Sequence, residues 1–368
     1  MDTLTSEAPT PAATTIELPT PEEVGQVIGK LMEDVSAMSG VLLTVLGQRL
    51  GLWQALAESG PATAAELASS SRTAEPYIRE WLRSQTAAGY VTYDPESARF
   101  ALPPAVAAVL AGAPLSGLVA GTAAQARVWW AELERYEDAF RSGSGIAWSE
   151  HPAEHSEAMD LISRAVVVAP LAHEWLRAVH GLANTLESGA IVADVGCGYG
   201  APTIAMAQAY PASRFTGFDS DDASIAHARR AAAEAGLADR VTFEVSPATE
   251  LRGGPFDLIT FVDVLHDLGE PVEALTAARR ALTDRGSVLL VEHAGSERLE
   301  ENLNPIGRFF YACSALVCTP NALSQSHAAL GTMPGEGILR RVAADAGFSD
   351  VRRVPVEAPL NMLLDLRP

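Results

Sequence analysis

Positive charge and cysteine are both scarce in this chain of 368 residues. Lys30 is the only lysine, and 26 basic residues face 46 acidic ones, which gives a net charge of −20 at pH 7. Phosphates and anionic membrane surfaces repel such a protein, so we expect no nucleic acid and no membrane as a general partner. The 3 cysteines show no CxxC spacing, which favours a reducing compartment over a disulfide framework.

Targeting and membrane-spanning signals are also missing from the sequence. Lys30 is the first basic residue of any kind, so the N-terminal segment lacks the positive region of a secretory signal and the arginines of a transit peptide. Residues 101–126 carry no charge, but three prolines interrupt them, which disfavours a bilayer-spanning helix. These absences predict a soluble cytoplasmic protein.

Composition and periodicity divide the chain into four parts. The first segment is rich in Pro, Thr and Ala, which is typical of a disordered tail, and the remainder shows helical and then strand patterns. We predict a disordered tail at 1–20, a winged-helix domain at 21–112, a helical linker and substrate cap at 113–182, and an α/β domain at 183–368.

The second part follows the order of a winged helix. Helical patterns begin at Pro21 and cover 40–59, 63–70 and 75–91, and the run VTYDPESARFAL then predicts a two-stranded hairpin.

Two functions of this module compete: reading DNA and packing against a partner subunit. A DNA-reading helix needs a basic face that neutralises phosphates. The helix at 75–91 instead carries as many nearby glutamates as arginines, at Glu75, Arg79, Glu80 and Arg83. The run GVLLTVLGQRLGLWQAL is too hydrophobic for a free surface. We therefore expect a homodimer that forms through this domain, with DNA binding as the alternative.

From Ile191 the pattern changes to short apolar strands separated by helices. The predicted strands are IVADVG, RFTGFD, VTFEVS, DLITFVDV and SVLLVE. This alternation predicts a parallel sheet that is covered on both faces, as in Rossmann-like α/β folds. The closing run DVRRVPVEAPLNMLLDL contains two strands without a helix between them, which predicts an antiparallel edge.

The loop after the first of these strands carries the clearest chemical signal. It reads Asp194-Val-Gly-Cys-Gly-Tyr-Gly200 and is followed by the helical run APTIAMAQAY. Its glycines allow a tight turn and let a ligand approach the bare backbone. The spacing is G-x-G-x-G, which differs from the G-x-G-x-x-G of dinucleotide-binding folds. The second strand ends at Asp219, where a carboxylate can accept hydrogen bonds from ribose hydroxyls.

These motifs resemble those of class I S-adenosylmethionine-dependent methyltransferases. ADVGCGYG with GFDSD is similar to their first two motifs, PFDLITFVDVLHD to their fourth, and the closing strand pair to their reversed seventh strand. Together with the winged helix, the chain resembles small-molecule methyltransferases that dimerise through that module, and ENLNPIGRFFYACSALVCTP resembles an actinobacterial subgroup. The resemblance implies a seven-stranded methyltransferase domain, S-adenosylmethionine as cofactor, and methylation of a small-molecule acceptor in specialised metabolism such as antibiotic biosynthesis.

The resemblance also implies which residues bind the cofactor. Asp194 would orient the glycine loop and help to bind the amino group, and Asp219 would hold the ribose. Where many relatives have an acidic residue near the adenine, this chain has Pro247, so backbone groups and apolar packing would hold the ring. The implied set is Asp194, Gly196, Cys197, Gly198, Gly200, Asp219, Ser220, Ala248 and Asp263.

A histidine just past the fourth strand is the predicted general base. His266 lies at the carboxyl edge, where open α/β sheets bind ligands, and imidazole titrates near neutral pH. Asp267 is the second predicted catalytic residue, but in helical geometry it points about 100° away from its neighbour. Asp263 is the alternative partner that could face His266, and a histidine that merely caps the backbone is the alternative role.

Three further residues are predicted to line the acceptor pocket. Trp148 lies in the glycine-rich loop RSGSGIAWSEHP, His293 follows the fifth strand, and His327 lies in the lid-like loop ALSQSHAALGTMPGE. Converging histidines would suit a metal ion, but no H-x-x-x-H spacing is present, so we predict no metal. A winged-helix regulator with a vestigial cofactor domain, and a cofactor-bound enzyme with a non-methylating reaction, are the alternative functions.

Overall fold

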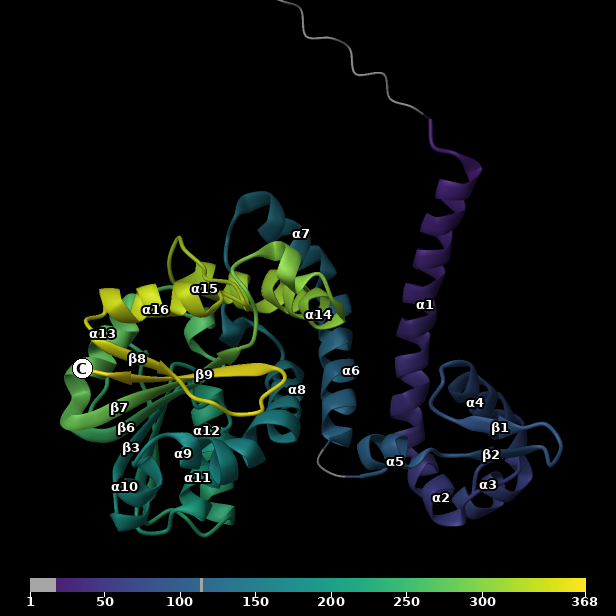
Figure 1. Ribbon diagram of the computed structural model, residues 1–368, viewed down its shortest axis with the longest axis horizontal. Helices are drawn as coiled ribbons and strands as arrows, with labels where there is room; N and C mark the ends of the chain where they lie inside the picture. Colours follow the sequence, from purple (N-terminus) through teal and green to yellow (C-terminus); the bar gives the residue numbers. More distant parts are fainter. Residues whose placement is uncertain (1–17, 113–114) are drawn as a thin grey trace, which may run out of the picture.

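The computed structural model describes residues 18–112 and 115–368 (Figure 1). Apart from its last three residues, the predicted tail at 1–20 lies outside the described part of the chain. A small N-terminal domain and a larger α/β domain are joined through a layer of helices (Figure 1).

The N-terminal domain has the predicted winged-helix order. Its elements are α1 (Pro21–Arg49), α2 (Leu52–Ser59), α3 (Ala64–Ser71), α4 (Glu75–Ala87), β1 (Thr92–Asp94) and β2 (Arg99–Ala101). The predicted start of a second helix at Gly40 is wrong, because α1 continues through that residue to Arg49. A glycine inside a helix costs only about 1 kcal/mol. The break comes instead at Gly51, whose left-handed φ of 68° turns the chain into α2.

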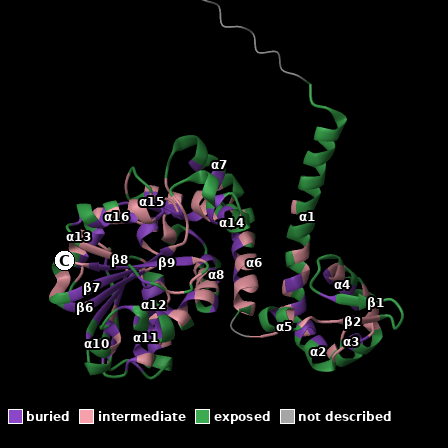
Figure 2. Ribbon diagram, in the orientation of Figure 1, coloured by how far each residue is buried: buried purple, intermediate pink, exposed green. Residues whose placement is uncertain are grey.

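Only the C-terminal end of α1 belongs to the core of this domain. Trp53 and Trp81 pack edge to face with ring centroids 4.8 Å apart, and Trp53 donates to the carbonyl of Thr44 at 2.9 Å. The rest of α1 projects away and exposes a series of apolar side chains (Figure 2): Val24, Val27, Ile28, Leu31, Met32, Val35, Met38, Val41 and Leu42.

One pair of helices in the described residues has the length and hydropathy of a membrane span. No single helix there is long and apolar enough to cross a bilayer; only α1 and α2 together, bent by 70°, satisfy length and composition.

A series of helices connects the two domains, and the last of them pack on one face of the sheet. They are α5 (Pro104–Leu110), α6 (Ser116–Ala131), α7 (Leu133–Ser142), η1 (Trp148–Glu150), α8 (Ala153–Ser163), η2 (Arg164–Val168), η3 (Leu171–Trp175), α9 (Leu176–Ala178) and α10 (Leu182–Ser188). Helices α6 and α8 pack closely at Gly121, where a Cβ atom would lie 2.8 Å from the carbonyl of Ala158. Gln48 at the end of α1 donates to the carbonyl of Ser116 at 3.1 Å, which ties the winged helix to α6.

The larger domain contains the predicted seven-stranded sheet. Its strands are β3 (Ile191–Val195), β4 (Arg214–Asp219), β5 (Val241–Val245), β6 (Phe256–Val262), β7 (Leu282–His293), β8 (Asp350–Arg353) and β9 (Asn361–Arg367). They lie in the order β5-β4-β3-β6-β7-β9-β8, and β9 runs antiparallel to both neighbours. The predicted α/β class and the antiparallel strand pair at the edge are confirmed.

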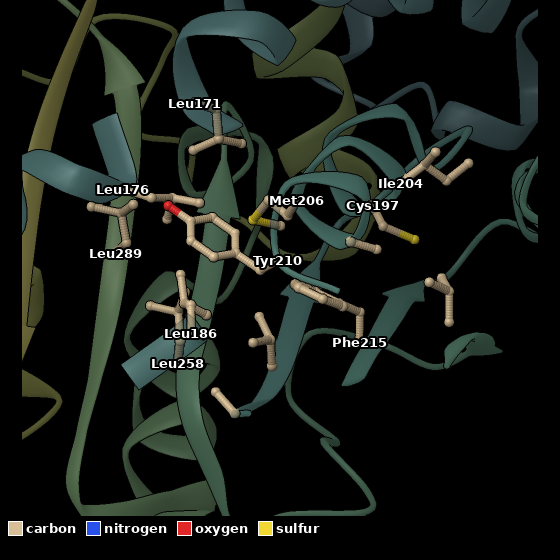
Figure 3. Close-up of a cluster of buried hydrophobic side chains, with 14 of the residues drawn as sticks. Leu171, Leu176, Leu186, Cys197, Ile204, Met206, Tyr210, Phe215, Leu258 and Leu289 are labelled. Atoms are coloured by element: carbon tan, nitrogen blue, oxygen red, sulfur yellow. The ribbon is translucent and has the colours of Figure 1, made fainter. Parts of the chain in front are cut away.

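Successive residues of each strand point to opposite faces of the sheet, and their side chains contribute to two hydrophobic cores, one on each face. Helices α11 (Ala201–Ala209) and α12 (Asp222–Glu234) cover one face, and α13 (Pro271–Ala281) and α16 (Glu336–Asp345) cover the other. Figure 3 shows the first core, where Tyr210 packs among leucines from the helices and strands. Two further helices and three single turns lie over the carboxyl edge: η4 (Leu265–Asp267), η5 (Leu299–Asn302), α14 (Pro305–Cys313), η6 (Ser314–Cys318) and α15 (Thr319–Gln325).

Candidate active site

A cavity of about 760 Å³ lies at the carboxyl ends of the central strands, under the helical layer. This is where a doubly wound sheet binds ligands, because the strand order reverses between β3 and β6. Most predicted site residues line it: Trp148, Gly196, Cys197, Gly198, Asp219, Ser220, Ala248, Asp263, His266, Asp267 and His293. Asp194, Gly200 and His327 do not.

The three glycines of the loop have different structural roles. All have left-handed φ values, of 69° at Gly196, 51° at Gly198 and 82° at Gly200. A Cβ atom at Gly196 would lie 2.5 Å from Val264, and one at Gly200 would lie 2.7 Å from Phe243. A Cβ atom at Gly198 would meet nothing within 4 Å. Packing therefore requires two of the glycines, whereas the third leaves bare backbone beside the open cavity.

Asp219 joins the second strand to the glycine loop. Its carboxylate accepts the backbone N–H of Gly198 and that of Asp221, each at 2.9 Å. Burial raises the pKa of this carboxyl group, although the two backbone donors act in the opposite direction. A carboxylate has about four acceptor sites, so Asp219 can also accept hydrogen bonds from hydroxyls in the cavity.

Asp194 lies beneath the loop rather than in the cavity wall. It is 1% exposed, and its two oxygens accept the hydroxyls of Thr203 on α11 and Thr260 on β6. Burial raises its pKa to about 6. These contacts hold the start of α11 against the sheet, which supports the loop. The contact with the cofactor's amino group stays a prediction.

His266 is held by a buried glutamate that the sequence analysis missed. Its Nδ1 lies 2.6 Å from Oε2 of Glu292, and Oε1 of that glutamate accepts the backbone N–H of Leu265 at 2.8 Å. Asp267 lies on the other side, with its Oδ1 3.5 Å from Nε2 of the histidine. The alternative partner, Asp263, is wrong: its Oδ1 accepts a hydrogen bond from the Asn361 amide at 2.7 Å and lies 3.9 Å from Nδ1 of His293.

The partner glutamate had a usable signal in the sequence. Glu292 ends the apolar run SVLLVE and is fully buried in β7. A carboxylate in a buried strand is costly unless it is paired, so a cationic or hydrogen-bonding partner should be sought beside it.

The pKa values of the two histidines in the cavity are shifted in opposite directions. Burial opposes the charge of His266, but the carboxylates of Glu292 and Asp267 outweigh it and raise the pKa well above the usual value for histidine. Burial lowers the pKa of His293 to about 4, against the attraction of Asp263. His266 is therefore the stronger base of the pair, and His293 is neutral at pH 7.

The three predicted histidines do not converge. His327 is exposed and does not line the cavity, so its predicted role in acceptor binding is wrong. The reason is that its loop turns outward after α15. Another group of ligand-type atoms does meet: those of His266, Asp267 and Cys318 lie within 4.8 Å of one another. Burial raises the pKa of the Cys318 thiol to about 11, and its sulfur accepts the hydroxyl of Thr332.

Trp148 lines the cavity from the helical layer. Its backbone N–H donates to Oδ1 of Asn321, and its indole N–H donates to the hydroxyl of Ser156, each at 3.0 Å. Sequence reasoning missed other lining side chains of this layer, notably Gln125 and Trp129 on α6. Their positions depend on how distant helices pack, which no local motif records.

Comparisons with known families agree with this architecture. Residues 186–338 match the family model of a methyltransferase domain, and residues 37–112 match that of an Rv2258c-like winged helix-turn-helix domain. The chain therefore contains a methyltransferase domain of the class I fold and an N-terminal winged-helix domain, as the resemblance implied. S-adenosylmethionine is the cofactor of this class, as the motifs predicted.

Two curated relatives match part of the chain. A ubiquinone biosynthesis O-methyltransferase of Pseudomonas paraeruginosa is 33% identical over 124 residues, which cover 33% of this chain and 50% of that protein. A 27-O-demethylrifamycin SV methyltransferase of Amycolatopsis mediterranei is 30% identical over 139 residues, which cover 36% of this chain and 51% of that protein. The match therefore spans about half the length of these relatives.

Structural similarity extends over nearly the whole chain. The mitomycin 7-O-methyltransferase MmcR superposes with a TM-score of 0.66 at 20% identity and covers 95% of this chain and 100% of its own. CalO1, a methyltransferase of calicheamicin biosynthesis, gives a TM-score of 0.65 at 19% identity and covers 93% of this chain and 98% of its own. At this identity the likeness shows the shared fold.

Proposed function

We propose that the protein transfers a methyl group from S-adenosylmethionine to an oxygen atom of a small molecule. The observation that carries the proposal is one cavity that joins the glycine loop, the Asp219 carboxylate and His266. A donor bound at the loop and an acceptor bound under the helical layer would meet beside this histidine. Holding two reactants in such an orientation accounts for a large part of the rate of a transfer reaction.

The residues at the loop fit the cofactor. The missing side chain of Gly198 leaves backbone accessible, and the carboxylate of Asp219 has acceptor capacity for ribose hydroxyls. Ser220, Pro247 and Ala248 line the same end of the cavity, where they would hold the adenine by packing and backbone contacts. The cofactor supplies an electrophilic methyl group, and the protein supplies orientation and proton transfer.

His266 is the proposed general base of the reaction. The contact with Glu292 fixes the tautomer that carries its proton on Nδ1, which leaves Nε2 to accept the proton of the acceptor hydroxyl. Glu292 and Asp267 then stabilise the imidazolium that forms, by the same interactions that raise the pKa of His266. Trp148 and His293 line the cavity on the acceptor side.

We propose that the chain forms a homodimer through its winged-helix domain. The exposed apolar side chains of α1, among them Leu31 and Val35, support this assembly, because a series of that length is rarely left in water. The arginines of α4 are neutralised, Arg79 by Glu75 at 3.0 Å and Arg83 by Glu80 at 2.8 Å, which disfavours DNA reading.

Specialised metabolism in the cytoplasm is the proposed setting. The names of the relatives that act on demethylrifamycin and mitomycin support antibiotic biosynthesis.

We propose that the chain is divided into a winged-helix domain at 21–112, a cap at 113–182 and a methyltransferase domain at 183–368.

The test is turnover by the wild type and by His266→Asn. The full chain is incubated with S-adenosylmethionine and a panel of hydroxylated aromatic compounds, and the release of S-adenosylhomocysteine is measured. We expect His266→Asn to lower kcat by about 10²–10⁴-fold, because the base is removed, while cofactor affinity stays near the wild-type value.

The matched control is His327→Asn, which alters an exposed histidine outside the cavity and should leave kcat unchanged. If His266→Asn keeps more than about a tenth of the wild-type kcat, the role of general base is wrong. Product formation without transfer of the methyl group would favour the non-methylating alternative.

A further inference from the structure

The cavity contains acidic residues but no basic side chain other than histidine. Within residues 18–112 and 115–368, no lysine or arginine lines it. The acidic lining residues are Asp160, Asp219, Asp263, Asp267 and Glu270. Asp160 pairs with Arg164, whose side chain is 46% exposed and is not part of the lining. An anionic acceptor would therefore lose its hydration without meeting a lysine or arginine, and the charge of His266 is already balanced by Glu292 and Asp267.

One face of α6 borders the acceptor side of the cavity. Leu118, Thr122, Gln125 and Trp129 all line it, and their spacing of four, three and four residues places them on one helical face. The hydroxyl of Thr122 is already used, because it donates to the carbonyl of Leu118 at 2.7 Å.

Two groups on this face are buried and unpaired. Gln125 is 2% exposed, and neither its amide nitrogen nor its amide oxygen has a hydrogen-bond partner among the described residues. The indole N–H of Trp129, one turn further along, is buried and unpaired within the same ranges. Unpaired polar groups are unfavourable in a protein interior, so a ligand that pairs with them gains affinity.

Two further helices give the cavity an apolar and partly aromatic lining. Ile306, Phe309 and Phe310 line it from α14, and Met159 and Ile162 line it from α8. Such walls favour a flat, apolar ligand, and a few placed polar groups then fix its orientation.

We propose that the acceptor is an uncharged molecule of fused aromatic rings with a carbonyl oxygen that Gln125 and Trp129 bind. This inference rests on the proposed methyl transfer and adds the class of acceptor. The two groups together offer N–H donors from both side chains and one amide acceptor, so a carbonyl oxygen can receive two hydrogen bonds. The ring system fills the apolar space, and a hydroxyl on it faces His266.

Three ring-matched probes test the proposal on the full chain in the presence of S-adenosylhomocysteine. They are 1-hydroxyanthraquinone, 1-hydroxyanthracene, which lacks the carbonyls, and a carboxylated 1-hydroxyanthraquinone. Quenching of tryptophan fluorescence gives each Kd. We expect the hydroxyanthracene to bind about fivefold to tenfold more weakly than the quinone, and the carboxylated probe at least about a hundredfold more weakly.

Gln125→Leu identifies the group responsible. The change keeps the size of the side chain and replaces a buried unpaired amide by an apolar group, which a fold tolerates well. We expect the variant to lose most of its preference for the quinone over the hydroxyanthracene, because only the indole N–H of Trp129 then remains for the carbonyl oxygen. Gln54→Leu, the same change at an exposed position outside this cavity, should keep the wild-type preference.

Two results would overturn the assignment of the acceptor while cofactor binding stays intact. One is wild-type affinity for the carboxylated probe that equals its affinity for the neutral quinone. The other is an unchanged preference for the quinone in Gln125→Leu. A wild type that does not bind S-adenosylhomocysteine would contradict the proposed function itself, and the acceptor class with it.

Discussion

At the scale of single residues, the contact between His266 and Glu292 determines how the site responds to pH. Only the unprotonated imidazole can accept a proton, so kcat should rise with pH through the pKa of His266. Because Glu292 and Asp267 raise that pKa, we expect half-maximal kcat at a pH above the ordinary histidine value of about 6.5.

Glu292→Gln tests which carboxylate is responsible. Loss of the negative charge at Nδ1 lowers the pKa of His266, so the rise in kcat should move to lower pH, and its plateau should fall because the imidazolium loses its partner. The pH profile of kcat measures both effects. Glu244→Gln, at an exposed position, is the control, and a profile that Glu292→Gln leaves unmoved would disprove the pairing.

The ligand-type atoms of His266, Asp267 and Cys318 lie close enough together to hold a metal ion, so a second test asks whether one is bound there. If the histidine acts as a base, treatment with a strong chelator should leave kcat unchanged, and metal analysis of the purified chain should find less than one equivalent. Loss of turnover that a single divalent metal restores would instead assign the three residues to a metal site.

At the scale of elements, the proposed dimer depends on the exposed apolar side chains of α1. Leu31→Glu together with Val35→Glu places charge in its apolar series, and we expect the wild-type dimer to become a monomer. Light scattering measures the mass. Gln26→Glu adds charge at an exposed polar position of the same helix and should leave the dimer intact. A wild type that is a stable monomer would refute the assembly.

The elements also show how far the sequence alone could lead. The apolar runs predicted the five parallel strands, and the absence of a helix between the last two strands predicted the antiparallel pair. The break after α1 was misplaced because the hydrophobic pattern continues across Gly40, whereas the left-handed turn at Gly51 depends on backbone conformation.

Residues within one motif were easier to place than residues from separate segments. The glycine loop is local, so the sequence located it. The pairing of His266 with Glu292, 26 residues later, depends on how η4 lies against the end of β7. The exposure of His327 likewise depends on the direction of a loop that no periodic pattern describes.

At the scale of the whole molecule, the helical layer and the carboxyl edge of the sheet surround one cavity. Arg308 on α14 makes a two-pronged ion pair with Asp34 on α1, at 2.9 and 2.8 Å, so the N-terminal domain contacts a helix that borders the acceptor. The helix that carries the proposed dimer surface and a helix that lines the cavity are therefore in direct contact.

The most direct test of the central claim is a calorimetric titration of S-adenosylhomocysteine into the wild type, Gly198→Val and Gly236→Val. Both glycines have left-handed φ values and open space at the Cβ position, but only Gly198 lines the cavity. With folding confirmed by circular dichroism, we expect the wild type and Gly236→Val to bind with similar Kd, and Gly198→Val to show no measurable binding. Undiminished binding by a folded Gly198→Val protein would contradict the account.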